Sequence, residues 1–119
     1  MGQIMVHNTH GKDDVERASL TFVVANTALN SKQETMVLLT IEGVWVATKG
    51  YTDGLQANGF APLSELIQQF VTNGGTVWVC GACAKPRNIV QEQLIGGAKI
   101  VGAATAVEAL VGGAQSLSF

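Results

Sequence analysis

Two cysteines, Cys80 and Cys83, are the residues of this sequence best suited to covalent chemistry, and they stand three positions apart. Two cysteines placed at random in such a chain would have this spacing in roughly 2% of cases, so the CxxC pattern is informative. Cys80 follows the apolar run 77–79, and Lys85 and Arg87 come shortly after it. Positive charge and exposed backbone N–H groups lower the pKa of a thiol, and the thiolate is the nucleophilic form. We therefore predict a reactive Cys80 at the end of a buried strand, with Cys83 in the next turn and both cations as anion-binding support.

His10 and Lys12 lie in a polar segment that follows the first apolar run of the chain. His10 is suited to act as a base or thiolate partner if this turn reaches the cysteine strand. Lys12 is suited to attract an anionic substrate such as a persulfide or sulfite. Each residue also has a plain structural explanation, His10 as a solvated turn residue and Lys12 as an ion-pair partner of Asp13 or Glu16. His7, within the apolar run, is predicted to be packed and hydrogen-bonded.

Several interpretations of the cysteine pair remain open. Cys80 can be a small buried hydrophobic residue that ends its strand, or the pair can be a thiol–disulfide redox couple of the thioredoxin kind. The cysteines can also be ligands in a non-catalytic module that binds a small anion or metal. A structural zinc site needs four N or S ligands, which one CxxC with His7 and His10 supports poorly, so no metal is predicted. No GxGxxG or GxxxxGK[ST] motif occurs, and no cofactor is predicted.

Short β-rich runs alternate with helical segments along the chain. Apolar residues recur at helical spacing from Val15 to Leu29, where aspartates cap the start, and in a helix that begins at Pro62 and stops before Asn73. Thr40 is predicted to cap a short helix that extends to about Lys49, and Thr105 with Glu108 a capping box. The remaining predicted elements are strands at 4–8, 35–40, 76–80, 99–102 and 115–119, a loop at 50–61, and helices at 89–95 and 105–111.

This βα alternation predicts how the candidate residues are brought together. Strands that are apolar on both faces favour a five-stranded, mainly parallel sheet covered by helices on both sides, a three-layer α/β/α architecture. Ligands of such sheets bind beyond the carboxyl ends of the strands. We therefore predict the site at the strand-to-helix turns, residues 9–14, 40–43, 80–88 and 102–105.

Composition limits the partners of this 119-residue chain, which has the length of one domain. Charged residues make up only 13% against 47% apolar residues, whereas roughly a quarter is usual, so we expect a homo-oligomer. A net charge of −2 without a basic cluster does not favour nucleic acid as a partner. No run resembles a membrane span or a secretion signal, and we expect a soluble, cytoplasmic protein with no membrane partner.

The segment 77–89, Val-Trp-Val-Cys-Gly-Ala-Cys-Ala-Lys-Pro-Arg-Asn-Ile, resembles the DsrE-like superfamily, which includes the DsrE/TusD sulfur-relay proteins and the YchN-like group. The opening Ile-Met-Val strand and the segments 39–44, 97–102 and 117–119 agree with it. The resemblance spans essentially the whole chain and implies a single DsrE-like domain over residues 1–119. It also implies a flavodoxin-resembling α/β/α fold that assembles into trimers or hexamers.

The same resemblance implies a function. In sulfur-relay members a cysteine at the end of this strand receives a sulfane sulfur as a persulfide and passes it on, and by position that cysteine is Cys80. Cys83 matches the second cysteine of the YchN-like pattern, and Arg87 matches an arginine that follows it. Asn88 stands where related sequences often have glycine, and asparagine tolerates a positive φ. The resemblance thus implies a sulfur carrier or sulfurtransferase, with sulfur donor and acceptor proteins as further partners.

Overall fold

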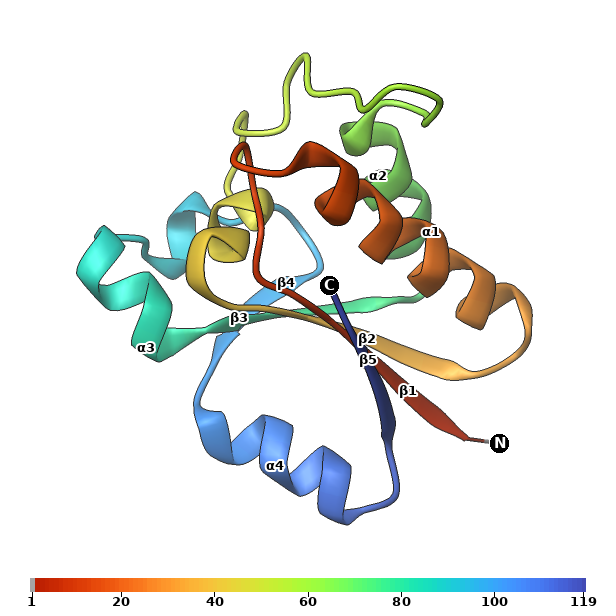
Figure 1. Cartoon of the computed structure of the whole chain (residues 1–119). Coiled ribbons are helices and arrows are strands. Elements are labelled where there is room, and N and C mark those ends of the chain that lie inside the picture. The colour runs from red at the N-terminus through yellow and green to blue at the C-terminus, as the bar shows by residue number, and fades with distance from the viewer. Residues whose placement is uncertain (1) are drawn as a thin grey trace.

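The computed structural model describes residues 2–119, which form a five-stranded sheet between helices (Figure 1). All neighbouring strands are parallel, in the order β4-β3-β2-β1-β5, and this confirms the predicted three-layer α/β/α architecture. The strands are β1 (Gln3–Asn8), β2 (Glu34–Leu39), β3 (Thr76–Cys80), β4 (Ala98–Val101) and β5 (Gln115–Ser118). The helices are α1 (Val15–Asn30), α2 (Leu63–Thr72), α3 (Gly81–Ala84) and α4 (Ala103–Val111), with 3-10 segments η1 (Ile41–Ala47), η2 (Lys85–Arg87) and η3 (Gln91–Gln93).

The strand order explains why the two faces of the sheet are covered differently. The chain steps in one direction from β1 to β4 and then returns to place β5 on the other side of β1. Because crossovers between parallel strands are right-handed, this reversal puts α4 on the face opposite α1 and α2. Figure 1 shows α4 alone on its side of the sheet. Flavodoxin has the order 2-1-3-4-5, so the likeness to it lies in the layers and the parallel sheet, not in the strand order.

The hydrophobic core lies mainly between the sheet and the pair α1 and α2. Phe22 of α1 and Phe70 of α2 are fully buried there and meet edge to face with ring centroids 5.8 Å apart. The α4 face holds a smaller cluster, built from Met5, Met36, Ala114, Leu38, Trp78, Ala106 and Ala109. No residue of α4 is buried. One side of the sheet is therefore thinly covered.

The helix predicted at residues 89–95 is wrong. The chain enters α3 directly after Cys80 and continues through η2, so Cys83 lies in a helical turn. Only one 3-10 turn, η3, falls in the predicted range. The apolar residues there gave a helical pattern, but Ile89 and Leu94 are buried whereas Val90 is exposed. Asn88 has the left-handed φ of 57° that its type permits, and it ends η2.

The predicted cap at Thr40 is confirmed in position, since Thr40 is the N-cap residue of η1, but its side chain makes no capping hydrogen bond. The predicted capping box of Thr105 and Glu108 is wrong. The α4 helix begins at Ala103 because β4 ends at Val101 and the chain turns at Gly102, so Thr105 lies inside the helix. The predicted aspartate cap of the first helix is confirmed, since the Asp14 side chain accepts a hydrogen bond from the N–H of Arg17.

None of the helices in residues 2–119 combines the length and the apolar character that a membrane crossing requires.

Replacing Gly43 of η1 by alanine is expected to destabilise the protein, because a Cβ atom there would lie 2.5 Å from the carbonyl oxygen of Asn8. Overpacking of this kind costs about 1–3 kcal/mol in the free energy of unfolding. Gly96→Ala is the control, since a Cβ atom at Gly96 meets nothing within 4 Å. Denaturant unfolding followed by circular dichroism measures both variants. Equal stability of the two would contradict the close packing of η1 against the end of β1.

Candidate functional site

Cys80 and Cys83 lie at the junction between a strand and a helix. Cys80 is the last residue of β3 and directly precedes α3, in which Cys83 is the third residue. Both thiols are free and partly accessible. The side chain of Cys83 and the backbone N–H groups of Cys83 and Ala82 are all close enough to the Cys80 thiol to affect its pKa. The CxxC spacing therefore brings the two sulfur atoms to one place.

Burial raises the pKa of the Cys80 thiol, so the predicted lowering is wrong. The neighbouring Cys83 thiol also raises this pKa, whereas the N–H groups of Cys83 and Ala82 lower it. The prediction fails because neither of the nearby cations lowers the pKa of the Cys80 thiol. An unpaired charge on a sulfur that is partly withdrawn from water is costly, so Cys80 is a neutral thiol at pH 7.

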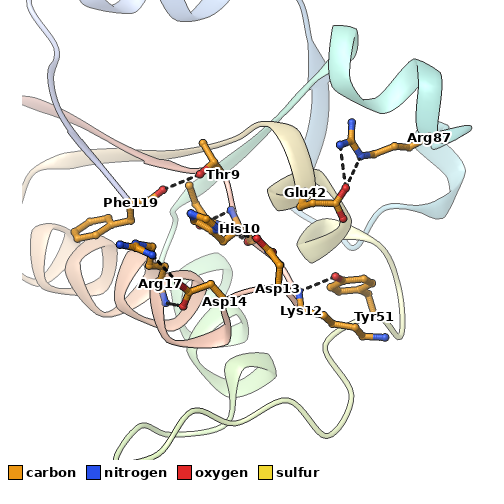
Figure 2. A network of polar contacts seen from close by, with 12 residues as sticks. Thr9, His10, Lys12, Asp13, Asp14, Arg17, Glu42, Tyr51, Arg87 and Phe119 are labelled. Atoms are coloured by element: carbon orange, nitrogen blue, oxygen red, sulfur yellow. Dashed lines mark hydrogen bonds and ion pairs between the residues drawn. The ribbon is translucent and has the colours of Figure 1, made fainter.

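Arg87 is held by other groups. Its Nη2 lies 2.9 Å from Oε1 of Glu42 in η1, and its Nη1 donates to the carbonyl oxygen of Cys83 at 3.1 Å. Figure 2 shows the Arg87–Glu42 pair joining the turn after Cys83 to the segment after β2. Arg87 thus fixes the position of α3, and the Glu42 carboxylate compensates the charge of its guanidinium group.

Cys80 opens into a pocket of about 200 Å³ between the carboxyl ends of the strands and α4, which we call the Cys80 pocket. Its lining includes Leu38, Thr40 and Cys80 from the strand ends, and Ala103, Ala106 and Val107 from α4. The predicted turns 40–43, 80–88 and 102–105 all contribute to it, because the ends of parallel strands meet at one edge. The predicted turn 9–14 does not. A larger hollow of about 330 Å³, between α2 and the segment after η1, contains neither cysteine.

Thr40 links the Cys80 pocket to His7. The Thr40 hydroxyl lies 2.6 Å from Nε2 of His7, whose Nδ1 lies 3.3 Å from the Ser118 hydroxyl. Burial lowers the pKa of His7, so its ring is neutral at pH 7. The packed, hydrogen-bonded state predicted for His7 is confirmed, but its connection to the cysteine pocket was missed. That connection depends on the register of β1 against β2, which pairs His7 with Leu38.

The other predicted site residues lie outside this pocket. His10 follows β1, which β2 separates from β3, and its Nδ1 contacts the Asp13 carboxylate at 2.7 Å (Figure 2). This hydrogen bond lowers the pKa of Asp13. The Lys12 ammonium lies 4.6 Å from the centre of the Tyr51 ring. Lys85 is exposed and lines a separate surface hollow. A role for His10, Lys12 or Lys85 in binding stays a prediction.

Within residues 2–119 no three side chains of the His, Cys, Asp and Glu types gather in a way that would hold a metal ion.

Comparison with solved structures shows the same fold in two proteins. YchN of Escherichia coli superposes with a TM-score of 0.78 at 15% identity, over 100% of this chain and 99% of YchN. MTH1491 of Methanobacterium thermoautotrophicum, a protein of unknown function, superposes with a TM-score of 0.78 at 13% identity, over 100% of both chains. At such low identity the likeness concerns the fold alone.

Comparison of sequences finds relatives and a family. MJ0760 of Methanocaldococcus jannaschii, an uncharacterised protein, is 30% identical over 103 residues, which are 87% of this chain and 38% of that protein. This chain thus spans less than half the length of MJ0760. MJ0989 of the same organism, also uncharacterised, is 35% identical over 97 residues, which are 82% of this chain and 79% of that protein. Residues 2–119 match the model of the DsrE/DsrF-like family, and the chain belongs to that family.

Proposed function

We propose that this protein is a sulfur carrier, or a sulfurtransferase-like protein, in which Cys80 holds a sulfane sulfur as a persulfide. The observation that carries the proposal is a partly accessible thiol at the end of β3 that opens into a pocket large enough for a small molecule. Membership of the DsrE/DsrF-like family supports it. In the loading step Cys80–SH and R–S–SH give Cys80–S–SH and R–SH. The S–S bond of the donor breaks, the leaving thiolate takes the proton, and no external oxidant or reductant is needed.

The residues around Cys80 supply what this step requires. The thiol must lose its proton as its sulfur attacks, and the N–H groups of Cys83 and Ala82 favour the negative charge that develops there. Thr40 lines the pocket, but its hydroxyl lies against Nε2 of the neutral His7 and adds no polar surface beside the thiol. The proton of Cys80 therefore passes to the leaving thiolate of the donor.

Cys83 has two possible uses after loading. Its thiol can take over the outer sulfur, which gives Cys83–S–SH and restores Cys80–SH. It can instead attack the inner sulfur of the persulfide, which gives a Cys80–Cys83 disulfide and releases H₂S. The adjacent free thiols also favour a second candidate function, a thiol–disulfide redox protein, in which the same disulfide forms by exchange with a substrate disulfide that is reduced to two thiols.

We further infer that copies of this chain assemble with one another. Charged residues make up only 13% of the sequence. The outer side of α4 exposes Val107, Leu110 and Val111, with 56%, 44% and 83% of their surfaces accessible. These three positions fall on one helical stripe, and apolar surface of this kind is typical of a protein–protein interface. Whether the assembly is the trimer or hexamer that the resemblance implies, and which proteins donate or accept sulfur, stay predictions.

Incubation with a sulfane-sulfur donor is expected to add about 32 Da, one sulfur atom, to the wild-type protein and to Cys83→Ser but not to Cys80→Ser. Serine keeps the size of each side chain nearly unchanged, so the two variants are matched controls for one another. Intact-mass spectrometry measures the adduct. Loss of two hydrogens without gain of sulfur would favour the redox candidate, and an adduct that persists in Cys80→Ser would refute the assignment of the carrier residue.

Alkylation of Cys80 by iodoacetamide in the Cys83→Ser variant is expected to depend on pH with a midpoint above the ~8.5 of a free cysteine. Burial raises the pKa of Cys80, so a smaller fraction is thiolate at pH 7 than in an unfolded chain, and this fraction rises only as the pH approaches the raised pKa. Reaction rates between pH 6 and pH 10, with the urea-unfolded variant as reference, give both midpoints. A midpoint for the folded protein below that of the unfolded one would contradict the assigned environment.

The substitution Val111→Lys is expected to shift the protein toward the 12.4 kDa monomer, because it places a charge in the apolar stripe of α4. Gln69→Lys, at an exposed position of α2, is the control and should leave the assembly unchanged. Light scattering coupled to gel filtration measures the mass, and circular dichroism checks that both variants fold. A wild-type protein that is already monomeric would rule out the assembly.

A further inference from the structure

The Cys80 pocket carries no charged side chain in its lining. Its walls are apolar surface from the strand ends and from α4, because the hydroxyl of Thr40, a lining residue, lies against His7. The volume of about 200 Å³ lies below the range of drug-sized ligand sites, which begins at about 300 Å³. A ligand of the Cys80 pocket is therefore small, and a charge on this ligand would not strengthen its binding.

We propose that the substrate class of this pocket is a small, uncharged, apolar sulfane-sulfur compound, an alkyl hydropersulfide in its neutral form, and that anionic donors such as thiosulfate are disfavoured. This inference rests on the proposed function and specifies the donor that the same cysteine accepts.

The distribution of cations supports this choice. An anion that leaves water needs a compensating charge. No lysine or arginine lines the Cys80 pocket, and Lys99, which β4 pairs with Trp78, is not part of the lining either. The Arg87 guanidinium is paired with Glu42. The Lys12 ammonium lies over Tyr51, and Lys85 lines a different hollow. An apolar alkyl group instead gains free energy by contact with Leu38, Ala106 and Val107.

Thr40 does not offset the apolar character of the pocket. Its hydroxyl lies 2.6 Å from Nε2 of His7, and the lining presents no oxygen or nitrogen surface to a ligand. An anion inside the pocket would therefore lack hydrogen-bond donors as well as a compensating charge.

Transfer from such a donor is balanced. The Cys80 sulfur attacks the outer sulfur of R–S–SH, the S–S bond breaks, and its electron pair leaves on R–S⁻. The proton released by Cys80 goes to R–S⁻ and forms R–SH. A protonated outer sulfur does not repel the developing thiolate, whereas a deprotonated one would. The neutral form is therefore the reactive form in this apolar pocket.

The test compares donors and alkylating reagents that differ in charge, with the Cys83→Ser variant, in which Cys80 is the remaining thiol. Propyl hydropersulfide released in solution and thiosulfate are supplied at equal concentration, and the growth of the one-sulfur adduct is timed by mass spectrometry. Iodoacetamide and iodoacetate, which differ little in size, give a readout that needs no sulfur transfer. For each pair we take the ratio of the reaction rate of the neutral reagent to that of the anionic reagent. We expect this ratio to be at least tenfold larger for the folded protein than for the urea-unfolded chain.

Two lysine variants provide the matched control. Ala103→Lys introduces a cation at an exposed position that lines the pocket, whereas Ala104→Lys introduces it at the next exposed position of α4, outside the lining. We expect Ala103→Lys to reduce the preference for neutral reagents at least threefold and Ala104→Lys to leave it unchanged. Equal preference in folded and unfolded protein would overturn the substrate class while the proposed function stands. No sulfur adduct from either donor would overturn both.

Discussion

The packing of α4 against the carboxyl end of the sheet is the contact on which the site depends. Right-handed crossovers leave α4 as the only α-helix on its face in residues 2–119, so this one helix supplies the outer wall beside Cys80. Ala106 illustrates its double role, since it packs in the small cluster with Met5 and Met36 and also lines the Cys80 pocket. The wall has low stability of its own, because α4 buries none of its residues completely. An assembly that covered its apolar outer side would hold it in place.

Burial, and not ionisation, sets the character of Cys80. Its raised pKa makes the thiolate scarce at pH 7, but the nucleophilicity of a thiolate increases with its pKa. A thiol of this kind reacts best when a substrate is held beside it, and the pocket between the strand ends and α4 offers room for a small one. The chain uses Arg87 to anchor α3 through Glu42, so that this cation stabilises the position of the cysteines instead of their charge.

The sequence predicts the sheet, its layers and the CxxC at a strand end, because alternating apolar runs and helical spacing are local properties. It does not predict which strands are neighbours. The sequence allows His10 to lie next to the cysteine strand, but β2 lies between β1 and β3. The contact between His7 and Thr40 and the pair between Arg87 and Glu42 join residues 33 and 45 positions apart. Such contacts depend on strand register and on the path of η1, which no local pattern encodes. The start of α3 was missed because apolar residues after Asn88 gave a stronger helical pattern than the segment after Cys80.

The proposed function requires that Cys80 receives sulfur and passes it on. The most direct measurement loads the protein with a donor whose sulfane sulfur is isotopically labelled, removes the donor, and then adds a small acceptor thiol. We expect the label to appear in the acceptor in an amount equal to the persulfide lost from Cys80, and we expect no transfer by Cys80→Ser. Label that never leaves the protein, or that transfers equally well without Cys80, would contradict the proposed function.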